Sequence, residues 1–356
     1  MYPFREGSFA VRNGWYVAAF ASDVTHDLLS RTILNQPVVL YRKEDGEAVA
    51  VGGRCPHRHF PLGASCLRGD EIVCGYHGIA FGPDGRCTDI PSQDFVPKSY
   101  KIPTYPLVEH GMWLWIWPGD PDKADPALLP DLATIGYDME GMVVEPFYTN
   151  EIKARYQLLN DNLLDLSHLG YLHGTSIGTP ENASTPEILT KRPGFLSSRR
   201  YIRNAPSPAA SAAMGRGTGR VDRTVGMDFY LPGFHAGIGE SFYAEGEARA
   251  GEMIQCSRVF HAVTPATHDS CYYFFGMGTP GGENLEKSRE YLKAVIAEDI
   301  FASEEIEKML KLVGGNPPEF MNKSDQNAVE GRRMLQAMMD AETQATNASV
   351  REQVDA

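Results

Sequence analysis

The chain has 356 residues, of which 42% are hydrophobic and 22% are charged. This length allows two domains with hydrophobic cores, and the composition is that of a globular protein. The formal net charge of −13 argues against nucleic-acid binding, which needs a basic surface. No apolar run approaches the length of a membrane helix, and the N-terminus has no secretory pattern. We therefore expect a cytoplasmic protein that binds neither nucleic acid nor membrane.

The first third of the chain is predicted to be a small all-β domain, residues 1–120. Short apolar strands alternate with turns, of which Glu44-Asp45-Gly46 and Pro83-Asp84-Gly85 are the clearest. The aromatic segment HGMWLWIWPG predicts a further strand that ends at Pro118-Gly119. The segment GDPDKADPALLPDL is rich in Pro and Asp and indicates a linker, which we place at residues 121–132.

The rest of the chain, residues 133–356, is predicted to be an α+β domain with a sheet and with helices at one side or end. The residue patterns predict a helix over 153–174, longer strands over 190–206, 218–234 and 252–278, and amphipathic helices over 284–312 and 323–346.

Two short motifs in the first domain combine cysteine with histidine. Cys55-Pro-His57 and Cys74-Gly-Tyr-His77 are separated by sixteen residues. Each motif places one thiolate and one imidazole at the tip of a tight loop, and a Rieske [2Fe–2S] centre needs two of each. Zinc sites usually pair Cys with Cys and His with His along the chain. The alternation therefore favours an iron–sulfur cluster over a structural zinc site.

A second set of candidate metal ligands lies in YQLLNDNLLDLSHLGYLH, residues 156–173. Two histidines and a carboxylate form the facial triad of non-haem Fe(II) oxygenases, so His168 and His173 are the candidate nitrogen ligands. Five residues correspond to about 140° of rotation on a helix, so we expect the helix to end or distort between them, near Gly170. Asp165 and His168 share a helix face, which places Asp165 beside a metal ligand rather than on the metal.

The third iron ligand must come from elsewhere, and Asp299 and Asp325 are the candidates. Asp299 lies in the apolar helical stretch AVIAEDIFASEEIE. Asp325 lies in NKSDQNAVEGRR, where it is well placed as a helix N-cap. Spacing alone does not decide between them.

The segments RCPHRHFPL and VCGYHG resemble the Rieske domain of ring-hydroxylating and demethylating oxygenases, and the resemblance continues through the whole chain. It is nearest to the vanillate O-demethylase and dicamba monooxygenase group, through LLNDNLLDLSHLGYLH and FHAVTPATHDSCYYFFG. The resemblance implies a Rieske [2Fe–2S] domain followed by a helix-grip (START-like) catalytic domain with an antiparallel sheet and flanking helices. It also implies a mononuclear Fe(II). In that group the carboxylate ligand lies in a Glu-Asp pair on such a helix, which matches Glu298-Asp299, so we choose Asp299.

The same resemblance implies how the two metal sites cooperate. It indicates a homotrimer arranged head to tail, in which the cluster of one subunit faces the iron of its neighbour. Asp165 matches the carboxylate that bridges His168 to His77 of the partner subunit. Asn162 matches a position near the iron that assists this path, with a helix-surface or capping role as the alternative. His261 matches a substrate-contacting position, with a core histidine as the alternative.

The implied activity is that of a Rieske-type mono- or dioxygenase, which uses O₂ and electrons from NAD(P)H. A separate flavin- and ferredoxin-type reductase is expected, since no G-x-G-x-x-G motif follows a strand in this chain. The implied substrate is a methoxylated aromatic acid, which is O-demethylated.

Other functions stay open at this point. The segments PSPAASAAMGRGTGR and FYLPGFHAGIGESF, expected to line or cover the pocket, depart from the group. Ring or side-chain hydroxylation of another aromatic compound is therefore an alternative. A Rieske electron carrier fused to a ligand-binding module and a zinc-stabilised interaction protein are two further classes.

Overall fold

The computed structural model describes residues 3–216, 219–314 and 317–354, which form two compact units. The β unit contains Arg12–Leu129 together with Thr264–His268. The sheet–helix unit contains the remaining described residues. Within the described part of the chain, every helix is too short or too polar to cross a membrane.

The β unit consists of three small antiparallel sheets, as the strand and turn pattern predicted. The first has the order β1 (Tyr16–Phe20), β10 (Trp113–Ile116) and β9 (Leu107–His110). The second has β2 (Leu29–Ile33), β3 (Gln36–Arg42) and β4 (Ala48–Gly52). The third has β5 (Cys66–Arg68), β6 (Glu71–Val73), β7 (Ala80–Phe81) and β8 (Cys87–Asp89). Short 3₁₀ turns lie at Ala21–Asp23, Leu62–Ala64, Pro121–Lys123 and Pro126–Leu128.

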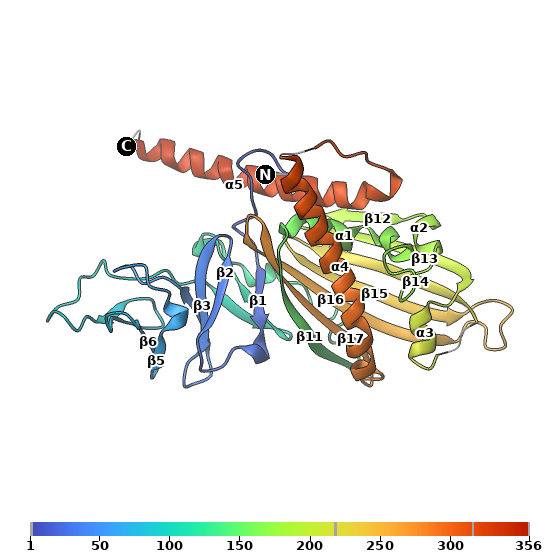
Figure 1. Ribbon diagram of the computed structural model, residues 1–356, viewed down its shortest axis with the longest axis horizontal. Helices are drawn as coiled ribbons and strands as arrows, with labels where there is room; N and C mark the ends of the chain where they lie inside the picture. Colours follow the sequence, from blue (N-terminus) through green and yellow to red (C-terminus); the bar gives the residue numbers. More distant parts are fainter. Residues whose placement is uncertain (1–2, 217–218, 315–316, 355–356) are drawn as a thin grey trace. The chain divides into compact units, whose positions relative to one another are not determined.

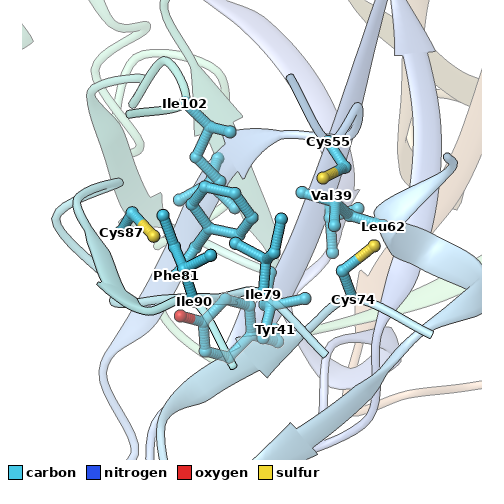
Figure 2. Close-up of a cluster of buried hydrophobic side chains, with 12 residues drawn as sticks. Val39, Tyr41, Cys55, Leu62, Cys74, Ile79, Phe81, Cys87, Ile90 and Ile102 are labelled. Atoms are coloured by element: carbon cyan, nitrogen blue, oxygen red, sulfur yellow. The ribbon is translucent and has the colours of Figure 1, made fainter. Parts of the chain in front are cut away.

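The second and third sheets share a hydrophobic core, shown in Figure 2. Tyr41, Phe81 and Leu62 are among its fully buried side chains. Cys55 and Cys74 belong to the same cluster and lie at one end of it, with Cys87 across the cluster from them. Both Cys–His motifs are therefore anchored to this core through their buried cysteines.

The sheet–helix unit is built on one seven-stranded sheet with the order β11-β17-β16-β15-β14-β13-β12 (Figure 1). The strand pairings described for it are antiparallel, as predicted. Its strands are β11 (Met142–Ile152), β12 (Ile188–Arg192), β13 (Phe195–Pro206), β14 (Arg220–Tyr230), β15 (Phe234–Tyr243), β16 (Met253–Thr267) and β17 (Ser270–Pro280).

Helices pack on this sheet, and Figure 1 shows the long helix α4 crossing it. α4 contacts β11 and β17, while α1 contacts α4, α5, β14 and β17. The helices are α1 (Tyr156–Leu164), α2 (Glu181–Ser184), α3 (Ala209–Ala213), α4 (Leu285–Val313) and α5 (Gln326–Val354), with 3₁₀ turns η5 (Leu166–Gly170) and η6 (Lys323–Asp325). The buried residues of α4 recur every three or four positions and so form one face. Asp299 lies on that face.

Several sequence predictions need correction. The segment 190–206, predicted as one strand, contains the end of β12 and all of β13, with a turn at Pro193-Gly194 between them. The helix predicted over 153–174 ends at Leu164, earlier than Gly170, because Asp165 has a non-helical backbone and caps η5 by accepting from the Ser167 backbone N–H. The segment 252–278 is a hairpin of two strands that turns at His268-Asp269 rather than one strand. The strands β11 and β15 were not predicted. Residue 218, the first of the predicted strand 218–234, lies outside the described residues.

Candidate metal centres and active site

The two Cys–His motifs form loops with the same backbone hydrogen bonds. Cys55 N–H donates to the Phe60 carbonyl and Cys74 N–H to the Ile79 carbonyl, five residues further along in each case. The Cys55 and Cys74 carbonyls accept from the N–H four residues on, that of His59 and that of Gly78. Both of these residues have a positive φ, 59° and 74°. The two motifs are thus equivalent tight loops, although their sequences differ.

The donor atoms of these loops differ in exposure. Cys55 and Cys74 are 1% and 2% exposed, whereas His57 and His77 are exposed. The imidazole rings of His57 and His77 lie side by side, with 4.5 Å between their centroids. Burial, followed by the neighbouring Cys74, raises the pKa of the Cys55 thiol. Two inner thiols and two outer imidazoles are the donor set of a Rieske cluster, so the residues present fit that group.

In the sheet–helix unit, His168 and His173 meet Asp299. The two imidazole centroids are 5.1 Å apart. Asp299 Oδ1 lies 3.0 Å from His173 Nε2 and 3.6 Å from His168 Nε2. One ligand atom from each of the three residues lies within 4.8 Å of the others. Two imidazole nitrogens and a carboxylate oxygen are the donor set of a mononuclear non-haem iron site, which these residues fit.

Hydrogen bonds to the other ring nitrogens orient both imidazoles. His168 Nδ1 donates to the backbone carbonyl of Asp165. His173 Nδ1 lies 2.6 Å from Glu298 Oε2. Both contacts leave Nε2 directed toward Asp299, as metal-binding imidazoles require. The sequence indicated Glu298 only as the neighbour of Asp299, whereas the structure shows its carboxylate in contact with His173.

The electrostatic surroundings of the two imidazoles differ. Burial lowers the pKa of His168, although the charge of Asp299 acts in the opposite direction. The lowered pKa keeps this ring neutral near pH 7. Burial alone would also lower the pKa of His173, but hydrogen bonds with Asp299 and Glu298 outweigh it and raise the pKa. The two carboxylates therefore create a local negative charge that suits a cation.

The other predicted site residues lie around this group. Asn162 Nδ2 donates to Asp299 Oδ1 at 3.0 Å. Asp165 is half-buried, and its Oδ2 accepts from Ser324 Oγ at 3.3 Å. Asp325 instead lies in η6, where its carboxylate accepts from the Asn322 backbone N–H in a capping box. The structure thus brings Asp299, and not Asp325, to the two histidines.

A cavity of about 240 Å³ opens beside His168, His173 and Asp299. Its walls are largely apolar and come from α1, α4 and strands β14 to β17. His261 lines it and is held by Tyr273, whose hydroxyl lies 2.6 Å from His261 Nδ1. Burial lowers the pKa of His261 to about 4, so the ring is neutral. The cavity also contains Arg223 and Asn182, which the sequence patterns did not single out.

Two family models match this chain. Residues 14–106 match the Rieske [2Fe-2S] domain. Residues 152–341 match the vanillate O-demethylase oxygenase C-terminal domain. Both candidate metal centres fall inside the matched ranges.

Several characterised proteins are similar over nearly the whole chain. The toluene-4-sulfonate monooxygenase system iron-sulfur subunit of Comamonas testosteroni is 32% identical, over 94% of this chain and 99% of its own. A vanillate O-demethylase oxygenase subunit of a Pseudomonas species is 31% identical, over 95% and 98%. The crystal structure of dicamba monooxygenase bound to 3,6-dichlorosalicylic acid has a TM-score of 0.84 at 29% identity, covering 94% of this chain and 99% of that one.

Proposed function

Because the chain belongs to the family of oxygenase components that join a Rieske [2Fe–2S] domain to a vanillate O-demethylase-type C-terminal domain, we propose that it O-demethylates a methoxylated aromatic acid. The chain is an oxidoreductase, and its cofactors are a Rieske [2Fe–2S] cluster and a mononuclear non-haem iron. The meeting of His168, His173 and Asp299 at the wall of a largely apolar cavity carries this proposal.

The proposal assigns Cys55, His57, Cys74 and His77 to the cluster. The equivalent hydrogen bonding of the two loops supports this assignment, since it places the four donors at two matching loop tips. Exposure of the two histidines leaves that edge accessible to an electron-transfer partner.

The proposal assigns His168, His173 and Asp299 to the iron, which supplies reductive activation of O₂ when it is bound. The residues around it then do three things. The hydrogen bonds of His168 Nδ1 and His173 Nδ1 hold both imidazoles in place. The apolar cavity walls exclude water. His261, which Tyr273 holds, offers a neutral imidazole to the substrate. One oxygen atom is inserted into a C–H bond of the methoxy group, and the resulting hemiacetal breaks down to formaldehyde and the phenol. The other oxygen atom is reduced to water with two electrons from NAD(P)H and two protons.

The partners belong to the same proposal. A reductase with flavin and a ferredoxin-type cluster delivers the electrons, and the protein works in the cytoplasm, where NAD(P)H is available. The chain assembles as a head-to-tail homotrimer in which Asp165 bridges His168 to His77 of the partner subunit. The half-buried carboxylate of Asp165 lies three residues before His168, and its charge acts on that ring, which supports the role.

A second candidate reaction is hydroxylation of a ring methyl group on an aromatic sulfonate. The observation that favours it is the 32% identity to the toluene-4-sulfonate monooxygenase subunit over nearly the whole chain. The same site serves both reactions, since each inserts one oxygen atom into a methyl C–H bond.

The test is substrate-dependent O₂ uptake by the reconstituted protein with NADH and a surrogate reductase. The substrates are a panel of methoxybenzoates, with toluene-4-sulfonate as the second arm. We expect formaldehyde and the matching phenol from a methoxybenzoate. A hydroxymethyl product from the sulfonate alone would favour the second candidate. Oxygen uptake without an identified product from any substrate would contradict both.

A further inference from the structure

A buried arginine lies in the wall of the cavity that the candidate iron ligands also line. Arg223 belongs to β14, in which Val221, Arg223, Val225 and Met227 all line the cavity. Alternate residues of a strand share one face, so Arg223 is directed to the cavity side of the sheet. It is only 7% exposed.

The guanidinium of Arg223 is incompletely paired. Nη2 donates to Thr179 Oγ1 at 2.6 Å and more weakly to Asn182 Oδ1 at 3.4 Å. Nε is buried without a hydrogen-bond partner, and no carboxylate in the described ranges forms an ion pair with Arg223. Burial lowers the pKa of Arg223, and the charge of Glu181 opposes this only from a distance. A buried cation without an ion pair is costly to a protein, which an anionic ligand would relieve.

A second donor lies beside this guanidinium. Asn182 is fully buried and lines the same cavity. Its Oδ1 accepts from the Thr179 N–H at 3.0 Å, which fixes the orientation of the amide. Its Nδ2 is buried and has no partner among the described residues. Arg223 and Asn182 thus both line the cavity, and each has a buried N–H donor without a partner among the described residues.

The sheet register separates Arg223 from His261 along the strands. Arg223, Ser241 and Gln255 form one row across β14, β15 and β16. His261, on which the charges of Asp299 and His168 act, stands in the row of Phe229 and His235. Six residues separate the two rows on each strand, about 20 Å between their backbone positions, so only an extended ligand that the Arg223 and His261 side chains approach from both ends reaches both rows. The rows between them are apolar or small, with glycine at both β15 positions (Val225-Gly239-Ser257 and Met227-Gly237-Val259).

We propose that Arg223 and Asn182 bind the anionic group of the substrate, a carboxylate or a sulfonate, and that the reacting carbon lies across the aromatic ring from it. This rests on the proposed aromatic oxygenation. A guanidinium matches the two oxygens of such an anion with parallel hydrogen bonds. The flat glycine-lined floor between the rows accommodates the ring. An acid group next to the reacting carbon, on the same side of the ring, would not reach Arg223.

The test is calorimetric titration of the anaerobic, metal-loaded enzyme with 4-methoxybenzoate, 4-methoxybenzamide, 2-methoxybenzoate and toluene-4-sulfonate. We expect the two para-substituted anions to bind about 10- to 100-fold more tightly than the neutral amide, which is the range for a charge-assisted hydrogen bond. The comparison of the 4- and 2-methoxy acids tests the position of the anion. The two anions distinguish a carboxylate from a sulfonate site.

Arg223→Gln should remove the preference for anions over the amide. Arg203→Gln is the matched control, since Arg203 is an exposed arginine on the neighbouring strand β13 whose side chain pairs with Asp222. It should bind all four compounds as the unchanged protein does. Arg223→Lys keeps a charge and should retain part of the preference, which provides a second variant if Arg223→Gln does not fold.

The proposal is overturned if the unchanged protein binds the amide as tightly as the acid, if it binds none of the anions, or if Arg223→Gln keeps the preference. Equal affinity for the 2- and 4-methoxy acids would overturn the placement across the ring. Formaldehyde release separates this proposal from the proposed function. A protein that prefers anions but releases no formaldehyde contradicts demethylation alone. One that demethylates amide and acid equally well contradicts the anion site alone.

Discussion

Asp299 has the central position among the candidate iron ligands. Its Oδ1 faces the Nε2 atoms of both histidines and accepts from Asn162. We expect Asp299→Ala to lose the mononuclear iron and keep the cluster, because the cluster donors lie in the other unit. Iron content should fall from about three to about two per chain with acid-labile sulfide unchanged. Metal analysis and the electron-spin signal of the reduced cluster measure both.

Asp325→Ala is the matched control for this experiment. Asp325 was the rival candidate, and its carboxylate caps η6. Its loss should cost about 1 kcal/mol of stability and no iron. Iron loss in Asp325→Ala, with iron retained in Asp299→Ala, would reverse the assignment.

Asp165 tests the proposed link between the two metal sites. Asp165→Asn keeps the size of the side chain and an oxygen that accepts from the Ser167 N–H, so the turn after α1 should persist. It removes the negative charge that would bind two imidazoles. We expect both metals to stay bound while turnover is nearly abolished, as measured by product formation and metal content. Normal product formation would disprove the bridging role.

Glu298 is a positioning residue for His173. Its Oε2 accepts from His173 Nδ1, which orients the ring and increases the basicity of Nε2. Glu298→Gln should weaken iron binding by about 10- to 100-fold. Competition with a calibrated chelator measures this affinity. An unchanged affinity would mean that the contact is only structural.

At the scale of the elements, the two cluster loops turn at equivalent positions occupied by different residues. Gly78 has φ 74°, and a Cβ there would lie 3.1 Å from Pro91 Cγ. His59 holds the same position in the other loop with φ 59°. Gly78→Ala should cost about 1–2 kcal/mol, since the left-handed conformation is strained for any side chain. Thermal unfolding of the metal-loaded protein and the visible absorbance of the cluster measure the effect.

His59→Gly is the reciprocal substitution. It removes the side chain that is strained in the same conformation, so it should leave stability unchanged or raise it by up to about 1 kcal/mol. A loss of stability in His59→Gly larger than in Gly78→Ala would show that the contact between Arg54 and the His59 ring outweighs the strain.

The sequence predicted those elements whose cause is local. The Cys–His loops and the turns at Gly46 and Gly85 carry their own turn residues, and α4 carries its own apolar periodicity. The end of α1 was placed too late, because the apolar spacing continues past Asp165 while the backbone changes there. β15 was missed because its three small residues, Ala236, Gly237 and Gly239, weaken the strand pattern.

The ligands that come from distant parts of the chain were harder to predict. Asp299 is 126 residues from His173, so only the packing of α4 against α1 brings them together. Arg223 and Asn182 meet through the path of the chain after η5 and the strand register, neither of which leaves a pattern in the sequence. Spacing therefore identifies pairs of ligands within a motif, and the tertiary fold completes the set.

In the proposed head-to-tail trimer, the cluster of one chain delivers electrons to the iron of the neighbouring chain. Trimers that mix two variants of the chain can test this arrangement. His57→Ala removes a proposed cluster ligand and Asp299→Ala a proposed iron ligand, so each variant should be inactive alone. Trimers that contain both variants have one interface at which an intact cluster site adjoins an intact iron site. These mixed trimers are isolated through two different tags. They should show about one third of the activity of the unsubstituted trimer, because one of three interfaces in such a closed ring is functional.

The alternative arrangement gives a different result. If each chain used its own cluster, every chain in the mixed trimer would lack one of its two centres, and no activity would return. Trimers of His57→Ala carrying both tags control for the tags and should be inactive in either case. Mass measurement of the double-tagged assembly verifies that it contains both variants. Because the two substitutions lie in different units of the chain, recovered activity can arise only from cooperation between subunits.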